Sequence, residues 1–171
     1  MNLMAKDTMA SSLTWRAEVT TGDVEAVRHL VAGTARFTAT EIDIAAELVE
    51  DRLKRGDASD YVFLLADAGD RLAGYTCYGP IAGTDRRYDL YWIAVDQALQ
   101  GAGLGSRLLE RTEDAIRARG GTRIYIETST LAAYIPTRAF YVTNGYLKAA
   151  TLPDFYRTGD GKAIFVKTVG E

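Results

Sequence analysis

Apolar residues recur along this chain with two different periods. Two stretches, Val24 to Val31 and Ile42 to Leu53, repeat apolar positions every three to four residues, as on the buried face of a helix. Thr21 is expected to cap the first helix, with acidic residues in its first turn. Thr38 and Glu41 have the spacing of a capping box and are expected to open the second helix.

Other stretches alternate apolar and polar residues, as strands do. In residues 123–128, Tyr125 and Glu127 fall on one face, and Ile124 and Ile126 fall on the other. Together with the turn signals, this alternation predicts strands at 13–19, 61–66, 72–78, 88–95, 123–128, 146–152 and 162–167. Further helices are expected at 103–119 and 137–144. A loop over 129–136 is expected to join the strand 123–128 to the second of these helices.

The order of these elements is β-α-α-β-β-β-α-β-α-β-β, which predicts one α/β domain over residues 13–171. The helix between strands 88–95 and 123–128 is expected to be a parallel crossover within a mixed, mostly antiparallel sheet. Residues 1–12 lack the apolar core of a signal peptide and are expected to form a disordered N-terminal tail.

Composition excludes several classes of function. The 171 residues carry a net charge of −3 and no basic stripe, which argues against nucleic acid as a partner. The single cysteine, Cys77, and the single histidine, His29, exclude a disulfide framework and a metal site built on either residue type. No apolar run reaches membrane-spanning length. These features predict a cytoplasmic protein that does not bind membranes.

The most informative motif is the glycine-rich stretch from Gln100 to Ser106, between a predicted strand and a predicted helix. Such a turn presents backbone N–H groups at a helix N-terminus and forms an anion site. A dinucleotide-binding fingerprint would place a third glycine where Ser106 stands, and the Gly-Lys-Ser/Thr of a Walker A loop is absent. Another phosphate-bearing ligand is therefore expected.

Gln100, Gly103 and Gly105 match the pattern Gln/Arg-x-x-Gly-x-Gly/Ala, and the segment from Ala139 to Tyr146 resembles the pattern Ala-x-x-Tyr-x-x-x-Gly-Phe, with Tyr141 and Gly145 at its Tyr-x-x-x-Gly spacing. In both motifs the chain resembles the GNAT superfamily of N-acetyltransferases. The resemblance implies helices flanking a mixed sheet, with one parallel strand pair splayed at an acetyl-CoA cleft. Within the superfamily, Ile124–Glu127 and Pro153–Tyr156 resemble segments of the ribosomal-protein alanine acetyltransferases.

The resemblance also implies which residues hold acetyl-CoA, the acyl donor. The backbone of the strand end is expected to bond the pantetheine arm, and the glycine loop is expected to bind the pyrophosphate. Tyr134 and Thr137 stand where the superfamily usually has Asn and Ala, so a specialised acceptor pocket is expected around Tyr134 and Pro136. The complete set is Ile93, Ala94, Val95, Gln100, Gly101, Ala102, Gly103, Leu104, Gly105, Ser106, Tyr134 and Thr137.

By the same resemblance, Tyr141 is the expected general acid toward the CoA thiolate and Glu127 the expected base toward the amine. Asp89 and Glu41 are alternative bases. The predicted function is N-acetylation of a primary amine, on a small molecule or a peptide or protein N-terminus, by direct attack in a ternary complex. The alternative is a non-catalytic acyl-CoA-binding module. An exposed sheet edge would allow a homodimer.

Overall fold

The computed structural model describes residues 13–170, so the predicted tail lies outside the described residues. The helices are α2 (Gly22–Gly33), α3 (Ala39–Arg55), α4 (Leu104–Ala118) and α5 (Ile135–Thr143). The strands are β1 (Thr14–Arg16), β2 (Val62–Ala68), β3 (Arg71–Pro80), β4 (Arg87–Val95), β5 (Arg123–Ser129), β6 (Leu147–Arg157) and β7 (Asp160–Thr168). Short 3-10 turns lie at Gly56–Ala58, Gln97–Leu99 and Ala132–Tyr134.

The described strands form a seven-stranded sheet in the order β1-β2-β3-β4-β5-β7-β6. β4 and β5 are parallel, with a register that runs from Arg87 and Arg123 to Leu90 and Ile126. β1 with β2, β2 with β3, β5 with β7, and β6 with β7 are antiparallel pairs. The predicted mixed sheet and its single parallel pair across the α4 crossover are therefore confirmed.

The chain divides into two compact units. Unit 1 contains Met1–Gly79 and Trp92–Thr112, and unit 2 contains Pro80–Tyr91 and Glu113–Glu171. Both β4 and α4 pass from one unit to the other, so each contributes residues to both. Within the described residues, no helix is both long and apolar enough to cross a membrane.

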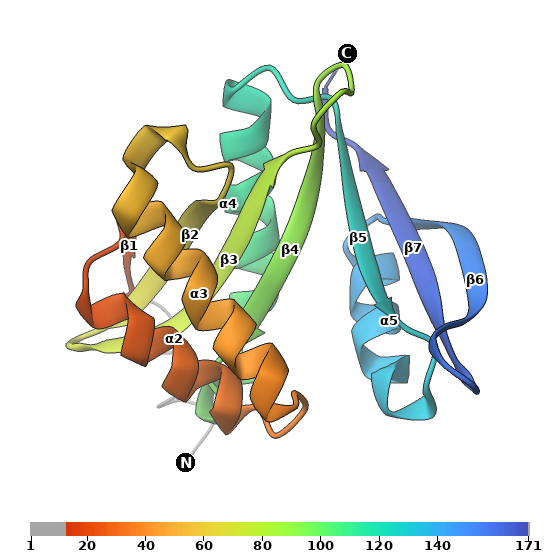
Figure 1. Ribbon diagram of the computed structural model, residues 1–171, viewed down its shortest axis with the longest axis horizontal. Helices are drawn as coiled ribbons and strands as arrows, with labels where there is room; N and C mark the ends of the chain where they lie inside the picture. The colour runs from red at the N-terminus through yellow and green to blue at the C-terminus, as the bar shows by residue number, and fades with distance from the viewer. Residues whose placement is uncertain (1–12, 171) are drawn as a thin grey trace. The chain divides into compact units, whose positions relative to one another are not determined.

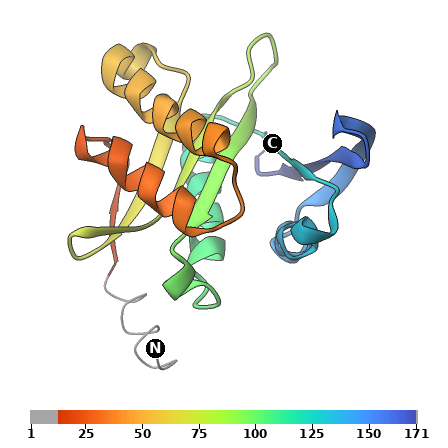
Figure 2. The same cartoon turned by 60° about the horizontal axis from the view of Figure 1, so that its bottom comes forward.

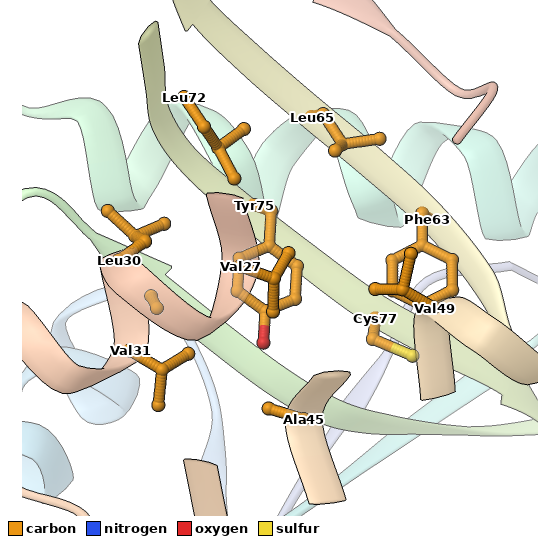
Figure 3. Close-up of a cluster of buried hydrophobic side chains, with 11 residues drawn as sticks. Val27, Leu30, Val31, Ala45, Val49, Phe63, Leu65, Leu72, Tyr75 and Cys77 are labelled. Atoms are coloured by element: carbon orange, nitrogen blue, oxygen red, sulfur yellow. The ribbon is translucent and has the colours of Figure 1, made fainter. Parts of the chain in front are cut away.

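Unit 1 packs helices on both faces of its strands. Figures 1 and 2 show α2 and α3 on one face of β2 and β3, with α4 on the other. On the first face, buried side chains from both helices point at the strands around Tyr75 (Figure 3). On the second face, Leu104 and Leu108 of α4 pack with Leu99, Ala66 and Ala73. This second core fixes where α4 begins.

Unit 2 buries one face of its strands and leaves the other open. Leu90, Ile124 and Ile126 are buried, whereas Asp89 and Tyr125, which pair with each other, are only partly buried. The predicted alternation along 123–128 is therefore confirmed. Phe165 of β7 pairs with Ile126, and its ring contacts Tyr141 of α5, so α5 covers the buried face (Figure 1).

Some predicted details are wrong. The capping box of Thr38 and Glu41 is present, but Thr21 makes no side-chain cap, because its backbone is helical rather than extended. Pro136 lies in the first turn of α5 instead of in a loop, a position where the missing N–H costs no helical hydrogen bond. β6 continues through Pro153, because an edge strand tolerates proline.

Candidate functional site

The glycine loop of unit 1 is anchored at both ends by the core. Leu99 and Leu104 are fully buried, whereas Gln100, Gly101 and Gly103 between them are exposed. Before the loop, the Asp96 side chain accepts a hydrogen bond from the backbone N–H of Ala98 at 2.8 Å. Two buried leucines thus hold an exposed backbone turn against the start of α4.

The loop has the conformation and the free space that an anion site needs. Gly101 and Gly103 have φ values of 83° and 76°, a backbone region that residues with a Cβ rarely adopt. A Cβ added at either residue would meet no atom within 4 Å, so the space beside the backbone is open. Leu104, Gly105 and Ser106 form the first helical turn, whose N–H groups have no acceptor within the helix. This geometry fits a pyrophosphate.

The strand end before the loop is held by close packing. The Asp96 backbone N–H donates to the Ala73 carbonyl at 2.8 Å. A Cβ on Gly74 would lie 3.0 Å from both the Ala94 carbonyl oxygen and Leu108 Cδ1, so α4 approaches the strands closely there. The side chains of Ile93 and Val95 pack against the core below the loop. Their side chains are therefore structural, and the role of their backbone stays a prediction.

Arginine side chains follow the loop along α4. The guanidinium carbons of Arg107 and Arg111 lie 5.3 and 4.4 Å from the ring centroid of Trp15 on β1. Such cation–π contacts favour the charged group over the ring face. Trp15 therefore holds positive charge on the first turns of α4, in the same unit as the glycine loop.

Tyr141, the expected acid, lies in the aromatic core of unit 2. Its ring centroid is 5.5 Å from Phe140, 6.1 Å from Tyr146 and 5.7 Å from Phe165, and the residue is 4% exposed. Burial raises the pKa of its hydroxyl above the usual value. The phenol therefore stays protonated and able to donate at neutral pH.

A buried polar group lies beside this aromatic core. Lys167 Nζ donates to Glu113 Oε2 at 2.7 Å and to the Asn144 carbonyl at 2.9 Å. Glu113 Oε1 and the Tyr146 hydroxyl are buried and have no hydrogen-bond partner among the described residues. Burial, followed by the charge of Glu113, raises the pKa of Tyr146. Tyr146 is therefore a second neutral phenol next to Tyr141.

Tyr134 and Thr137 begin the helix that carries Tyr141. Tyr134 is the N-cap of α5 and Thr137 lies in the first turn, so their spacing places all three near one face of the helix. The preceding loop is held by Arg138, which donates to the carbonyls of Ser129 and Leu131 at 2.7 and 3.0 Å. The segment before α5 is therefore held in place by side-chain hydrogen bonds.

Glu127, the expected base, lies on the opposite face of the unit 2 strands from Tyr141. Its neighbour Ile126 pairs with Phe165 on the buried face, and successive strand residues point to opposite faces. On the open face, Glu127 Oε2 forms an ion pair with Lys162 Nζ. The structure therefore does not bring Glu127 and Tyr141 into contact within unit 2.

The two alternative bases have different environments. Glu41 accepts hydrogen bonds from the backbone N–H and the hydroxyl of Thr38 at 2.7 and 2.8 Å, so its carboxylate is committed to the capping box. Asp89 is partly buried on the open face of unit 2. Burial, followed by the charge of Glu127, raises its pKa, and Lys162 opposes that shift. Asp89 is therefore the better alternative.

Sequence reasoning missed Lys162. It precedes an alternation in which Ala163 and Phe165 are buried and Ile164 and Val166 are partly buried. The available signal was that Lys162 falls on the same strand face as Ile164 and Val166, where a charged side chain needs a partner. Its pairing with Glu127 depends on the β5–β7 register, which the sequence does not display.

Comparison with known proteins places the chain in a family. A sequence model described as "Acetyltransferase (GNAT) family" matches residues 25–146. The chain belongs to this family. A solved structure of a Desulfovibrio desulfuricans protein of the GNAT family is similar, with a TM-score of 0.91 and 42% identity. The similarity covers 92% of this chain and 99% of that one.

Two further relatives show how far the likeness extends. Mycothiol acetyltransferase from Beutenbergia cavernae is 34% identical over 140 residues, which are 77% of this chain and 45% of the relative. This chain thus matches less than half the length of that curated relative. The Escherichia coli ribosomal-protein-S18-alanine N-acetyltransferase has a TM-score of 0.73 at 22% identity, covering 93% and 95% of the two chains. That likeness concerns the fold.

In this GNAT chain the expected site residues divide between the two units. Unit 1 contains Ile93–Val95 and the loop from Gln100 to Ser106. Unit 2 contains Glu127 and the α5 residues Tyr134, Thr137 and Tyr141. The expected anion-binding loop and the expected acid and base therefore lie in different units.

Proposed function

We propose that this GNAT chain transfers the acetyl group of acetyl-CoA to a primary amine by direct attack in a ternary complex. The observation that carries the proposal is the glycine loop at the start of α4, with open space beside Gly101 and Gly103. It lies within the region matched by the family, residues 25–146. Both units act as one acetyltransferase domain in this proposal, over residues 13–171.

The donor is bound mainly by backbone. N–H groups from Gly101 to Ser106 bind the pyrophosphate, and Gln100 begins the loop. Backbone groups of Ile93, Ala94 and Val95 bond the pantetheine amide as an added strand would. Tyr134 and Thr137, at the start of α5, take the positions that contact the pantetheine arm in the family. Bound there, acetyl-CoA supplies the thioester carbonyl that the amine attacks.

Tyr141 donates the proton that the departing thiolate needs. Its buried phenol is neutral, because burial raises its pKa. The base acts on the amine nitrogen and the acid acts on the thioester sulfur. These two atoms are different substituents of the reacting carbon. An acid on the α5 side and a carboxylate on the open face are compatible with that division.

The base is a carboxylate on the open face of unit 2, either Glu127 or Asp89. An amine must be neutral when it attacks, and a lysine-like amine is normally protonated at neutral pH. A carboxylate that accepts this proton, directly or through water, makes the nucleophile available. Glu127 matches the family's proposed base, whereas Asp89 is the less solvated of the two.

The acceptor is a small-molecule amine or the N-terminus of a peptide or protein. The relatives include enzymes named for mycothiol and for the S18-alanine of a ribosomal protein, so the ribosomal-protein branch remains one candidate among several. We also propose a cytoplasmic location, because the single cysteine, Cys77, is a free thiol. Exposed β6 at the sheet edge would allow a homodimer.

Release of free CoA thiol tests this function. The purified chain is incubated with acetyl-CoA and a panel of amino acids, polyamines, aminoglycosides and peptides, and CoA affinity is measured separately. Acetylation of at least one amine above the hydrolysis background is expected. Tight CoA binding without turnover on any amine would instead favour the non-catalytic acyl-CoA-binding module. No CoA binding would contradict both.

A further inference from the structure

The open face of unit 2 brings charged side chains from three strands together. We define this open face by Asp89 on β4, Tyr125 and Glu127 on β5, and Lys162 on β7. Asp89 pairs with Tyr125, and Glu127 lies two residues further along β5. Lys162 pairs with Ser129 and reaches back to Glu127. The face therefore holds two carboxylates and one ammonium.

Lys162 is the fixed member of its ion pair. Its side chain is 12% exposed, whereas that of Glu127 is 48% exposed. The ammonium lies 3.7 Å from the ring centroid of Phe155 and 5.9 Å from that of Tyr156, both on β6. A cation held against an aromatic face and partly desolvated is strongly localised. Glu127 is thus held by a lysine that the β6–β7 hairpin itself positions.

Asp89 differs from Glu127 in having no such partner. Within the described residues it forms no hydrogen bond and no ion pair. It is nevertheless close enough to respond to both neighbours, because Glu127 raises its pKa and Lys162 lowers it. Arg87, two residues earlier on β4, donates instead to Thr122 Oγ1. Two tyrosines share this face with Asp89: Tyr125 pairs with it on β5, and Tyr91 lies two residues further along β4.

We propose that Lys162 is a positioning residue that divides the work of the two carboxylates: it engages Glu127, and Asp89 accepts the proton of the acceptor amine. This inference rests on the proposed function. The Asp89 carboxylate takes a proton from R-NH₃⁺, and the neutral nitrogen then forms the N–C bond. The C–S bond breaks with its electron pair on sulfur, and the thiolate takes the phenolic proton of Tyr141. Solvent returns a proton to Tyr141 and receives the protons released by Asp89 and the new amide nitrogen.

Carboxyl NMR titration of Asp89 tests the charge coupling without any substrate. In Lys162→Met the pKa of Asp89 should rise by about one pH unit, and in Glu127→Gln it should fall by a similar amount. Lys162→Arg should restore the wild-type titration. Lys148→Met, an exposed lysine on β6, is the matched control and should leave Asp89 unchanged. The Glu127→Gln arm still tests the coupling if Lys162→Met does not fold.

Turnover on an identified acceptor then tests the assignment of the base. Asp89→Asn should lower kcat by about 100-fold and remove the acidic limb of the kcat/KM profile. The loss of kcat in Glu127→Gln should be smaller than the loss in Asp89→Asn by a factor of about ten or more. Lys162→Met should move the acidic limb to higher pH by the shift that NMR gives for Asp89.

Three results would overturn the inference. Asp89 could titrate identically in Lys162→Met and Glu127→Gln, which would remove the coupling. Glu127→Gln could be as damaging as Asp89→Asn, which would make Glu127 the base. The acidic limb could stay in place in Lys162→Met although Asp89 shifts. Failure of the wild-type chain to acetylate any amine is a different outcome, because it overturns the proposed function while the NMR coupling remains measurable.

Discussion

Unit 1 contains a buried aspartate and unit 2 a partly buried one, and the two units shift the pKa of these carboxylates in opposite directions. In unit 1, Asp23 is 3% exposed and accepts hydrogen bonds from both terminal nitrogens of Arg16, at 2.7 and 2.6 Å. The Thr20 backbone N–H and hydroxyl add bonds at 2.6 and 2.9 Å. Burial alone raises the pKa of Asp23, but these donors outweigh it and hold the pKa below the usual value.

In unit 2, Asp89 has no comparable set of donors, and burial together with Glu127 raises its pKa. The difference separates a carboxylate that the fold surrounds with donors from one that it leaves without them. A carboxylate surrounded by donors stabilises the folded state and is a poor base. A carboxylate that is desolvated next to a second negative charge destabilises the fold and accepts protons more readily. Unit 1 therefore holds an aspartate that is committed to structure, and unit 2 holds one that is available to accept a proton.

The largest expected effect is on unit 2 chemistry. Tyr141→Phe removes one hydroxyl from the aromatic core and should lower kcat by about 100-fold or more, because the leaving thiolate loses its acid. Steady-state kinetics with an identified acceptor measures this loss. Tyr146→Phe is the matched control: it removes a second buried hydroxyl, one that responds to the charge of Glu113, from the same core and should leave kcat nearly unchanged. Equal losses in both variants would argue that only core packing is affected.

The next effect concerns the stability of unit 1. Arg16 forms ion pairs with both Asp23 and Asp67, so Arg16→Met leaves Asp23 buried without its charged donor and leaves Asp67 without this ion pair. The free energy of unfolding should fall by about 2–3 kcal/mol at pH 7, as urea titration would measure. Arg28→Met removes an exposed ion pair with Asp43 and should have little effect. Comparable losses in the two variants would contradict the structural role given to the buried pair.

A smaller effect should separate donor binding from turnover. Gly103→Ala places a Cβ at a φ of 76°, which costs about 1 kcal/mol and should raise the KM for acetyl-CoA about fivefold. The kcat should change little, because the proton-transfer groups are untouched. Gly83→Ala imposes the same strain at a φ of 75° in the β3–β4 loop, where a Cβ also meets nothing within 4 Å. That control should leave the KM for acetyl-CoA unchanged.

The smallest effect is the opposite pH dependence of the two aspartates. Asp23 has a lowered folded pKa, so its contribution to stability is present above the ordinary value of 3.8 and is lost as the pH falls through the folded pKa. Asp89 has a raised folded pKa, so its ionisation costs stability as the pH rises above 3.8. Melting curves from pH 3 to 7 should show Asp23→Asn less stable than the wild type at pH 7 and Asp89→Asn more stable. Both differences should shrink as the pH falls toward 3. The same sign for both would contradict the comparison.

The sequence predicted the parts of the fold that depend on local spacing. Alternation placed Glu127 opposite Ile126, and the capping box of Thr38 and Glu41 formed as expected. It failed where backbone conformation or tertiary structure decides the outcome. Thr21 makes no side-chain cap because its backbone is helical, and Asp23 accepts hydrogen bonds from Arg16 of β1. Neither outcome changes the local pattern of apolar and polar positions.

The candidate site follows the same division. The glycine loop was predictable, because a turn with positive φ leaves its mark in consecutive residues. The contact between Lys162 and Glu127 was not, because it depends on the register of two strands far apart in the chain. The environment of Asp89 was equally hidden, whereas the capping box already accounted for Glu41 in the sequence. Choosing between the candidate bases therefore needs the tertiary contacts.

CoA affinity, measured by calorimetry for the wild-type chain, Gly103→Ala and Tyr141→Phe, tests the division of labour most directly. In the proposed function the loop binds the donor and Tyr141 acts on it, so Tyr141→Phe should bind CoA as the wild type does. Gly103→Ala should bind about fivefold more weakly. Wild-type affinity in Gly103→Ala, together with weakened binding in Tyr141→Phe, would contradict the roles given to the two units.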